Sequence, residues 1–224
     1  MSSKLKFLVL LFFFHNAWSQ NNEYLIDYSN LFKTTSANSI DENKNKIEGS
    51  QYIDKEFHPS TFSCFSEVTP PIRYNVFKEE MEFITDGKLY YVNINDNCEI
   101  TLSNNTYKYF FNYDNKKNNG YLIILNKSKD SKYILYKKEK VKFVPEFVPS
   151  SSYVEEKPAK YLIDKSKYFI KIQNGLIEFP EKKSELLKLF PNSKDAIELF
   201  LKEKNIRLNE ESNLIELINY LNSL

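Results

Sequence analysis

Histidine, glycine, cysteine and tryptophan are scarce in this chain of 224 residues, which has two, four, two and one of them. His15 lies in a segment that the sequence predicts to be removed, so His58 is the only histidine of the mature chain, and a histidine-rich zinc or non-haem iron centre is excluded. The glycines are too far apart to build a phosphate-binding loop of the Walker or dinucleotide type. We therefore expect no metal and no cofactor. The four glycines are Gly49, Gly87, Gly120 and Gly175.

An excess of charge of either sign is also lacking. The chain has 31 Lys and Arg residues against 30 Asp and Glu residues. A protein that binds the phosphate backbone of nucleic acids usually has a basic surplus. The sequence therefore predicts no nucleic-acid partner.

The N-terminus has the three-part pattern of a secretory signal. Residues 1–19 contain an early pair of lysines, an apolar run over residues 7–14 and a small-residue site that predicts cleavage between Ser19 and Gln20. The apolar run is much shorter than the roughly 20 residues that span a bilayer. We expect an exported mature chain, periplasmic or extracellular, without a transmembrane anchor.

Export would place the two cysteines, Cys64 and Cys98, where disulfides persist. A bridge between them would close a loop of about 34 residues, worth about 3 to 4 kcal/mol if the loop-entropy account holds. The alternative is two separate buried thiols that act as small apolar residues. Either way the cysteines are structural, because only His58 could serve as the base of a cysteine nucleophile.

Composition changes divide the mature chain into three regions. Residues 20–50 are largely polar and are predicted to form a mobile lead-in. Residues 51–180 have short apolar and aromatic runs between turn residues, a pattern typical of antiparallel β structure, with a proline- and serine-rich connection at 145–158. Residues 181–224 change to the helical period.

Asx-Gly pairs are the strongest turn signals, because they favour the positive φ angles of tight hairpins. They occur at Asp86-Gly87, Asn119-Gly120 and Asn174-Gly175. The strands predicted to pair around them are Met81–Thr85 with Lys88–Ile94, Tyr107–Tyr113 with Tyr121–Asn126 and Tyr168–Ile172 with Leu176–Phe179, and a further meander is predicted from Lys132–Lys138 and Val141–Val144.

About nine to twelve short strands follow from this pattern, too many for one flat sheet. The predicted fold class is therefore α+β: a strongly curved antiparallel sheet or two packed β layers, followed by C-terminal helices. Asn192 or Ser193 is placed to cap a helix after Pro191. The apolar helical faces are Leu186, Leu187, Leu189 and Phe190, then Ala196, Ile197, Phe200 and Leu201, then Leu214, Ile215, Leu217, Ile218 and Leu221.

Several segments resemble a family of uncharacterised exported proteins common in Bacteroidetes. These segments are Gly49–Phe57, Arg73–Phe83 with Gly87–Tyr91, Leu186–Pro191 and Asn219–Asn222. The resemblance covers most of the mature chain and implies the exported location and this architecture. It implies no activity, substrate or catalytic residue.

Four aromatic residues are the strongest candidates for ligand binding. Tyr107, Tyr109, Phe111 and Tyr113 alternate along one predicted strand and so should share a face. If exposed, this face could stack on a sugar, a peptide or a lipid tail. If buried, it is the core of the sheet.

Two glutamates raise the possibility of carboxylate chemistry. Strand alternation places Glu80 and Glu82 on one face, where they could act as an acid and base pair or simply be solvated. Their spacing lacks the interleaved pattern of a calcium loop. Arg73 is placed to pair with a glutamate across the hairpin, and His58 is expected to be a surface or structural residue.

Together these features favour an exported, non-enzymatic binding module. Its ligand would be a small molecule, a glycan, a lipid or an envelope protein. The first alternative is a structural or assembly component of the cell envelope, and a weaker one is a hydrolase that uses paired carboxylates.

Overall fold

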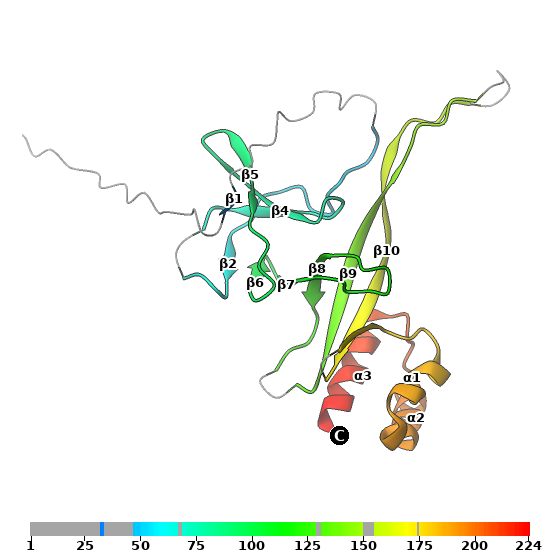
Figure 1. The fold of residues 1–224 in the computed structure, drawn as a ribbon. Coiled ribbons are helices and arrows are strands. Elements are labelled where there is room, and N and C mark those ends of the chain that lie inside the picture. The colour runs from blue at the N-terminus through cyan, green and yellow to red at the C-terminus, as the bar shows by residue number, and fades with distance from the viewer. Residues whose placement is uncertain (1–31, 34–46, 67–68, 129–130, 150–154, 174) are drawn as a thin grey trace, which may run out of the picture.

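The structure is a computed structural model that describes residues 32–33, 47–66, 69–128, 131–149, 155–173 and 175–224 (Figure 1). The predicted signal segment at residues 1–19, its cleavage site at Ser19 and Gln20, and most of the predicted lead-in at 20–50 lie outside the described residues.

Two antiparallel sheets make up the β region, which confirms the α+β class and the two-layer alternative. The small sheet has the order β1-β5-β4-β3 and the large sheet the order β11-β10-β9-β8-β7-β6-β2. The small sheet consists of β1 (Phe32–Lys33), β3 (Ile72–Asn75), β4 (Glu80–Thr85) and β5 (Lys88–Val92). The large sheet consists of β2 (Ser60–Phe62), β6 (Glu99–Leu102), β7 (Asn105–Phe110), β8 (Gly120–Ile124), β9 (Tyr133–Val144), β10 (Lys160–Ile172) and β11 (Gly175–Glu178).

The three Asx-Gly pairs have different roles in the fold. Asp86 and Gly87 have φ angles of 49° and 70°, and β4 pairs with β5 around them as predicted. The β10–β11 hairpin is also confirmed, with Ile172 opposite Gly175. Gly120, however, does not have a positive φ; it is the first residue of β8, and a Cβ there would lie 2.4 Å from the Glu79 carboxylate. The prediction that Gly120 is a turn glycine was therefore wrong, since its role is to leave space.

The longest strands differ from the predicted short meander. The segments 132–138 and 141–144 form one strand, β9, because nothing between them favours a turn and β10 pairs with β9 along its length. The predicted connection at 145–158 therefore closes the β9–β10 hairpin, with one isolated bridge between Phe147 and Lys157. Figure 1 shows the end of this hairpin extending away from the rest of the molecule. The described residues 140–149 and 155–164 are called the arm below.

The three predicted helical segments are confirmed. They are α1 (Lys183–Leu189), α2 (Lys194–Glu203) and α3 (Glu211–Ser223), with a 3₁₀ turn, η3 (Pro191–Ser193), before α2. The predicted side-chain cap was wrong: Ser193 is at the N-cap of α2 without a capping hydrogen bond, because the 3₁₀ turn continues directly into the helix. Within the described residues, no helix combines the length and apolar character needed to cross a bilayer.

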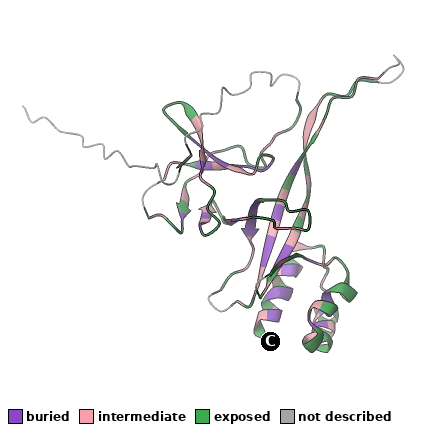
Figure 2. Cartoon of the chain, in the orientation of Figure 1, coloured by how far each residue is buried: buried purple, intermediate pink, exposed green. Residues whose placement is uncertain are grey.

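Three apolar clusters organise the packing (Figure 2). The first, called the sandwich core, lies between the two sheets and includes Tyr74, Phe83 and Val141. The second, called the helix core, joins the three helices to Leu135 of β9 and Ile170 of β10. Leu135 and Val141 are an even number of residues apart on β9, so their side chains lie on the same face of the large sheet. The helices therefore cover one part of this face, around Leu135, and the small sheet covers another part, around Val141. The third cluster, with Phe169, lies on the opposite face of the large sheet.

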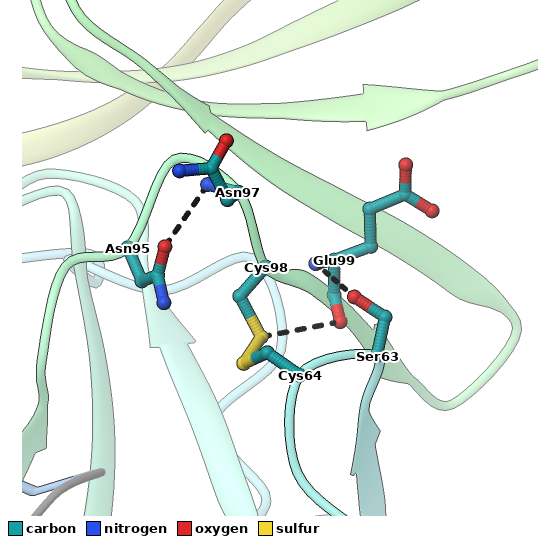
Figure 3. The surroundings of a disulfide bond; sticks show 6 residues. All are labelled: Ser63, Cys64, Asn95, Asn97, Cys98 and Glu99. Carbon is teal, nitrogen blue, oxygen red and sulfur yellow. Dashed lines mark hydrogen bonds between the residues drawn. A yellow bond between two sulfur atoms is a disulfide. The ribbon is translucent and has the colours of Figure 1, made fainter.

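A disulfide joins Cys64, which follows β2, to Cys98, which precedes β6 (Figure 3). Their Cα atoms are 5.2 Å apart, so of the two alternatives that the sequence left open, the bridge is the one that the structure has. Beside it, the Glu99 amide donates to Ser63 Oγ at 2.8 Å and the Ser63 amide donates to the Glu99 carbonyl at 2.9 Å. The enclosed loop contains β3, β4 and β5. The chain leaves the large sheet after β2 and returns to it at β6, and the disulfide joins these two points.

Candidate functional site

The first two predicted aromatic residues lie in the sandwich core. Tyr107 and Tyr109 are 5% and 6% exposed. The ring of Tyr107 packs edge-on against Tyr74 at 5.3 Å, and the ring of Tyr109 against Tyr121 at 4.9 Å. Burial raises the pKa of the Tyr107 and Tyr121 hydroxyls, so both stay neutral.

The other two predicted aromatic residues leave this face. β7 ends at Phe110, and Asn112 has a φ of 51°, so the strand alternation stops before Tyr113. Phe111 is 54% exposed and touches Tyr109 at 5.1 Å between ring centroids, whereas Tyr113 packs on Phe169 at 5.3 Å on the opposite side of the sheet. The four aromatics thus do not form one continuous face.

Glu82 is completely buried, contrary to the prediction of a solvated glutamate face. Its Oε2 accepts from the Arg73 guanidinium at 2.9 Å and from the Tyr52 hydroxyl at 2.8 Å, and its Oε1 accepts from Asn75 at 2.9 Å. The guanidinium also lies 4.1 Å from the ring centroid of Tyr52 and 4.5 Å from that of Phe57. The predicted pairing of Arg73 is confirmed, and the loop that carries Tyr52 and Phe57 covers the pair.

Burial separates the Glu82 carboxylate from solvent. Both oxygens of Glu82 have hydrogen-bond partners inside the protein, so neither faces a substrate. Neither Glu80 nor Glu82 lines the two pockets described below.

A second buried ion pair was not identified from the sequence. Glu79 pairs with Lys138 of β9, which is 4% exposed. Glu79 Oε2 also accepts from the Tyr74 hydroxyl at 2.6 Å and the Tyr121 amide at 3.1 Å, and burial lowers the pKa of Lys138. Glu79 has a φ of 60°, and the missing side chain of Gly120 provides the space for its carboxylate. The pair fastens the β3–β4 turn to the large sheet.

The structure gives His58 a partner that the sequence analysis missed. The Nε2 atom of His58 lies 2.8 Å from Asp54 Oδ2. The two residues are four apart in the sequence, and this spacing was the signal from which their contact could have been predicted. The pKa of Asp54 is lowered chiefly by the hydrogen bond that its carboxylate accepts from the Glu56 backbone amide, and further by its contact with His58. Within the described residues the His58 ring has no other hydrogen-bond partner, so no nucleophile is coupled to it.

His58 and Asp54 line a surface groove of about 100 Å³. Its remaining walls come from the 102–107 hairpin, from β3 and Val76, and from Glu139 of β9. The groove thus brings together residues from four separate parts of the sequence, 53–58, 73–76, 102–107 and 139. A second pocket, of about 150 Å³, lies beside the disulfide and is lined mainly by apolar residues that include Phe62, Val92 and Ile100.

The arm exposes large apolar side chains. It carries five exposed large apolar residues: Phe143 (40% exposed), Phe147 (50%), Val148 (63%), Leu162 (36%) and Ile163 (66%). Its base is packed: Val141 is buried in the sandwich core, and the Tyr161 ring contacts Phe77 at 5.0 Å and Phe143 at 5.2 Å between ring centroids. The Tyr161 hydroxyl also accepts a hydrogen bond from Gln51 Nε2 at 2.9 Å, and Lys142 and Asp164 form an ion pair at 3.6 Å.

Among the described residues, no group of three or more His, Cys, Asp or Glu side chains could hold a metal ion. Comparisons of the chain with protein-family models, curated proteins and solved structures find no match.

Proposed function

We propose that the protein is an exported, non-enzymatic binding module that recognises another protein through the arm. The observation that carries this proposal is the set of exposed apolar side chains on the arm, which lie on both faces of the hairpin. The hairpin projects from the rest of the molecule (Figure 1). Large apolar patches on a protein surface usually mark interaction sites.

Two features support an exported location. The N-terminal residues have the pattern of a secretory signal. The Cys64–Cys98 disulfide is of a kind that persists in oxidising compartments and is rare in the cytosol. The resemblance to exported proteins of Bacteroidetes is part of the same proposal.

A protein ligand fits the geometry better than an enclosed glycan, lipid or small molecule. The space between the sheets is filled by apolar and aromatic side chains. The two surface pockets, at about 100 and 150 Å³, are smaller than the roughly 300 to 1,000 Å³ of typical small-molecule sites. The arm, in contrast, offers a long surface of the kind that an extended or flat partner can cover.

The internal pairing of charged groups supports a non-enzymatic role. Glu82 is satisfied by Arg73, Asn75 and Tyr52, and Lys138 by Glu79. A catalytic acid, base or nucleophile must instead reach a substrate. Under the proposal, these groups stabilise the scaffold that holds the arm.

Crosslinking from the arm tests the proposal. A photoreactive amino acid at Ile163 should capture one discrete partner from a cell-envelope extract of the source organism. The double substitution Phe147→Asp and Ile163→Asp should remove capture from a neighbouring arm position, because charge on both strands opposes apolar contact. The matched control is Leu199→Asp on α2, a residue that is 56% exposed and far from the arm in the fold.

Capture that survives the double substitution, or that is lost equally with Leu199→Asp, would refute the arm as the binding surface. The alternative of an assembly component would use the same surface, but its complex with the partner would be long-lived. A complex that co-purifies at fixed stoichiometry through gel filtration would favour an assembly component over a transient binding module.

A further inference from the structure

The groove beside His58 has a buried apolar floor. Val76, Tyr107 and Leu102 line it and are 3%, 5% and 6% exposed. Ile53, at 42% exposed, adds an apolar rim. A ligand group that enters the groove therefore meets apolar surface before it meets the protein interior.

Acidic groups dominate the charge around this floor. Asp54, Glu56 and Glu139 line the groove. The charge of Arg73, which also lines it, is compensated by Glu82, because the Nε and Nη2 atoms of Arg73 each lie 2.9 Å from Glu82 Oε2. His58 is the remaining basic group and is paired with Asp54. The groove thus has an uncompensated acidic wall.

Glu139 is the distinctive member of this wall. It is half-buried, and within the described residues its carboxylate has no hydrogen bond or ion pair. The neighbouring lysines on β9 are both engaged elsewhere: Lys137 with Glu211 at 2.9 Å, and Lys138 with Glu79. Burial raises the pKa of Glu139, and this effect outweighs the opposing charges of Lys137 and Lys138.

We infer that the groove binds an alkylammonium group, such as a lysine side chain, with the ammonium at Glu139 and the methylene stem on the apolar floor. A lysine side chain combines these two chemistries, an apolar stem and a charged end. The volume of about 100 Å³ suits a single side chain rather than a whole metabolite. This inference concerns a surface other than the arm and goes beyond the proposed function.

An NMR titration of the whole mature chain with small probes tests the inference. Nα-acetyl-lysine amide, at up to about 10 mM, should shift the backbone amide signals of groove residues such as Ile53, Ser103 and Asn105. Nα-acetyl-norleucine amide has a similar stem without the charge and should shift them far less. Acetylation of the lysine Nζ should abolish the shifts, because it removes the cation.

Glu139→Gln should weaken the binding of the lysine probe by about fivefold or more, because it replaces the carboxylate with a neutral group of similar shape. The control Glu203→Gln removes the same charge from an exposed position at the end of α2 and should leave binding unchanged. The amide spectra themselves show whether each variant is folded.

The source of the amine is resolved by comparing n-butylamine with a lysine-containing tripeptide. Tighter binding of the tripeptide supports a peptide ligand, and equal binding supports a free amine, both at the proposed site. Equal shifts from the lysine and norleucine probes, unchanged binding in Glu139→Gln, or no groove shifts at the highest concentration would each overturn the inference.

Discussion

The sandwich core and the helix core stabilise the same large sheet by different means. The buried members of the helix core are all Leu, Ile or Phe. The sandwich core is rich in tyrosine and is bordered by the three polar side chains that are buried among the described residues, Asn75, Glu82 and Lys138. The disulfide and the space-giving Gly120 also belong to this end of the molecule.

The difference teaches how each contact is specified. Leu, Ile and Phe side chains pack wherever volume and pattern agree, so the helix core tolerates rearrangement. Buried ion pairs tolerate only the partner and geometry that satisfy them, because an unpaired buried charge is costly. We infer that the polar pairs fix how the small sheet sits on the large one, whereas the helices are held by apolar area.

The largest expected effect comes from breaking the Arg73–Glu82 pair. Arg73→Met leaves the Glu82 carboxylate buried without its cation and should lower the free energy of unfolding by about 3 to 5 kcal/mol, measured by urea denaturation. The double variant Arg73→Met, Glu82→Met should recover more than half of this loss, because it removes the buried charge.

The matched change at the helix end is Leu217→Met. It keeps the side chain apolar at similar volume and should cost less than about 1.5 kcal/mol. A double variant at Arg73 and Glu82 that is no more stable than Arg73→Met, or a Leu217→Met cost as large as that of Arg73→Met, would break the contrast between the two cores.

Loss of the disulfide should act mainly on the sandwich end. Replacing both Cys64 and Cys98 with Ser opens a loop with a sequence separation of 34 residues, and the loop-entropy account gives a cost of about 3 to 4 kcal/mol. Native-state hydrogen exchange should show larger losses of protection in β3, β4 and β5 than in α3. Equal losses in both regions would show that the molecule opens as one unit.

Gly120→Ala tests the space that receives Glu79. The new Cβ would lie 2.4 Å from Glu79 Oε2, and the carboxylate is held by Lys138, Tyr74 and the Tyr121 amide. The variant should be destabilised by about 1 to 3 kcal/mol in thermal or urea unfolding. The cost should shrink in a Glu79→Ala background, since the clash is then absent.

Gly87→Ala is the control for this experiment. Gly87 has a φ of 70°, but no heavy atom lies within 4 Å of the place that an added methyl group would take, so its substitution introduces backbone strain of about 1 kcal/mol without a clash. Its cost should be the same with or without Glu79→Ala. A Gly120→Ala cost that is equally insensitive to Glu79 would contradict the role of Gly120 in leaving space for that carboxylate.

The smallest effect is expected in the alkaline titration of tyrosines. Burial raises the pKa of Tyr74, in the sandwich core, well above its ordinary value, and it raises the pKa of Tyr136, in the third cluster, to about 12. A raised pKa in the folded state means that the stabilisation is complete below the ordinary value near 10 and is lost as the pH rises from about 10 through the folded-state value.

Absorbance near 295 nm measures tyrosinate. As the pH rises, it should therefore increase at higher pH than for free tyrosine, and it should increase cooperatively when the protein unfolds. The helix core has fewer buried hydroxyls, so circular dichroism of the helices should change only at the same cooperative step. A simple titration centred near pH 10 for all tyrosines would contradict the buried tyrosines of the sandwich core.

Sequence patterns predicted the helices and the β4–β5 and β10–β11 hairpins, because each depends on local geometry. The two cysteines left a disulfide and two separate thiols as alternatives, since the distance between them depends on the tertiary structure. They failed for Glu82, since strand alternation reveals a face but not the loop that covers it. They missed Glu139 as part of a groove and Lys138 as the partner of Glu79, since these residues lie far from their neighbours in the sequence. The aromatic set divided because Asn112 interrupts an alternation that the sequence suggested was continuous.

The sequence by itself determined the α+β class, the positions of the helices and the absence of a glycine-rich phosphate loop, because periodicity and composition act locally. Only the tertiary structure decided that the helices and the small sheet share one face of the large sheet, that Glu82 is buried and that Glu139 has no hydrogen bond or ion pair among the described residues. Those outcomes depend on which distant segments pack together. The free energy of a charged group depends on its burial and its partners in the folded structure, and the local sequence does not specify either.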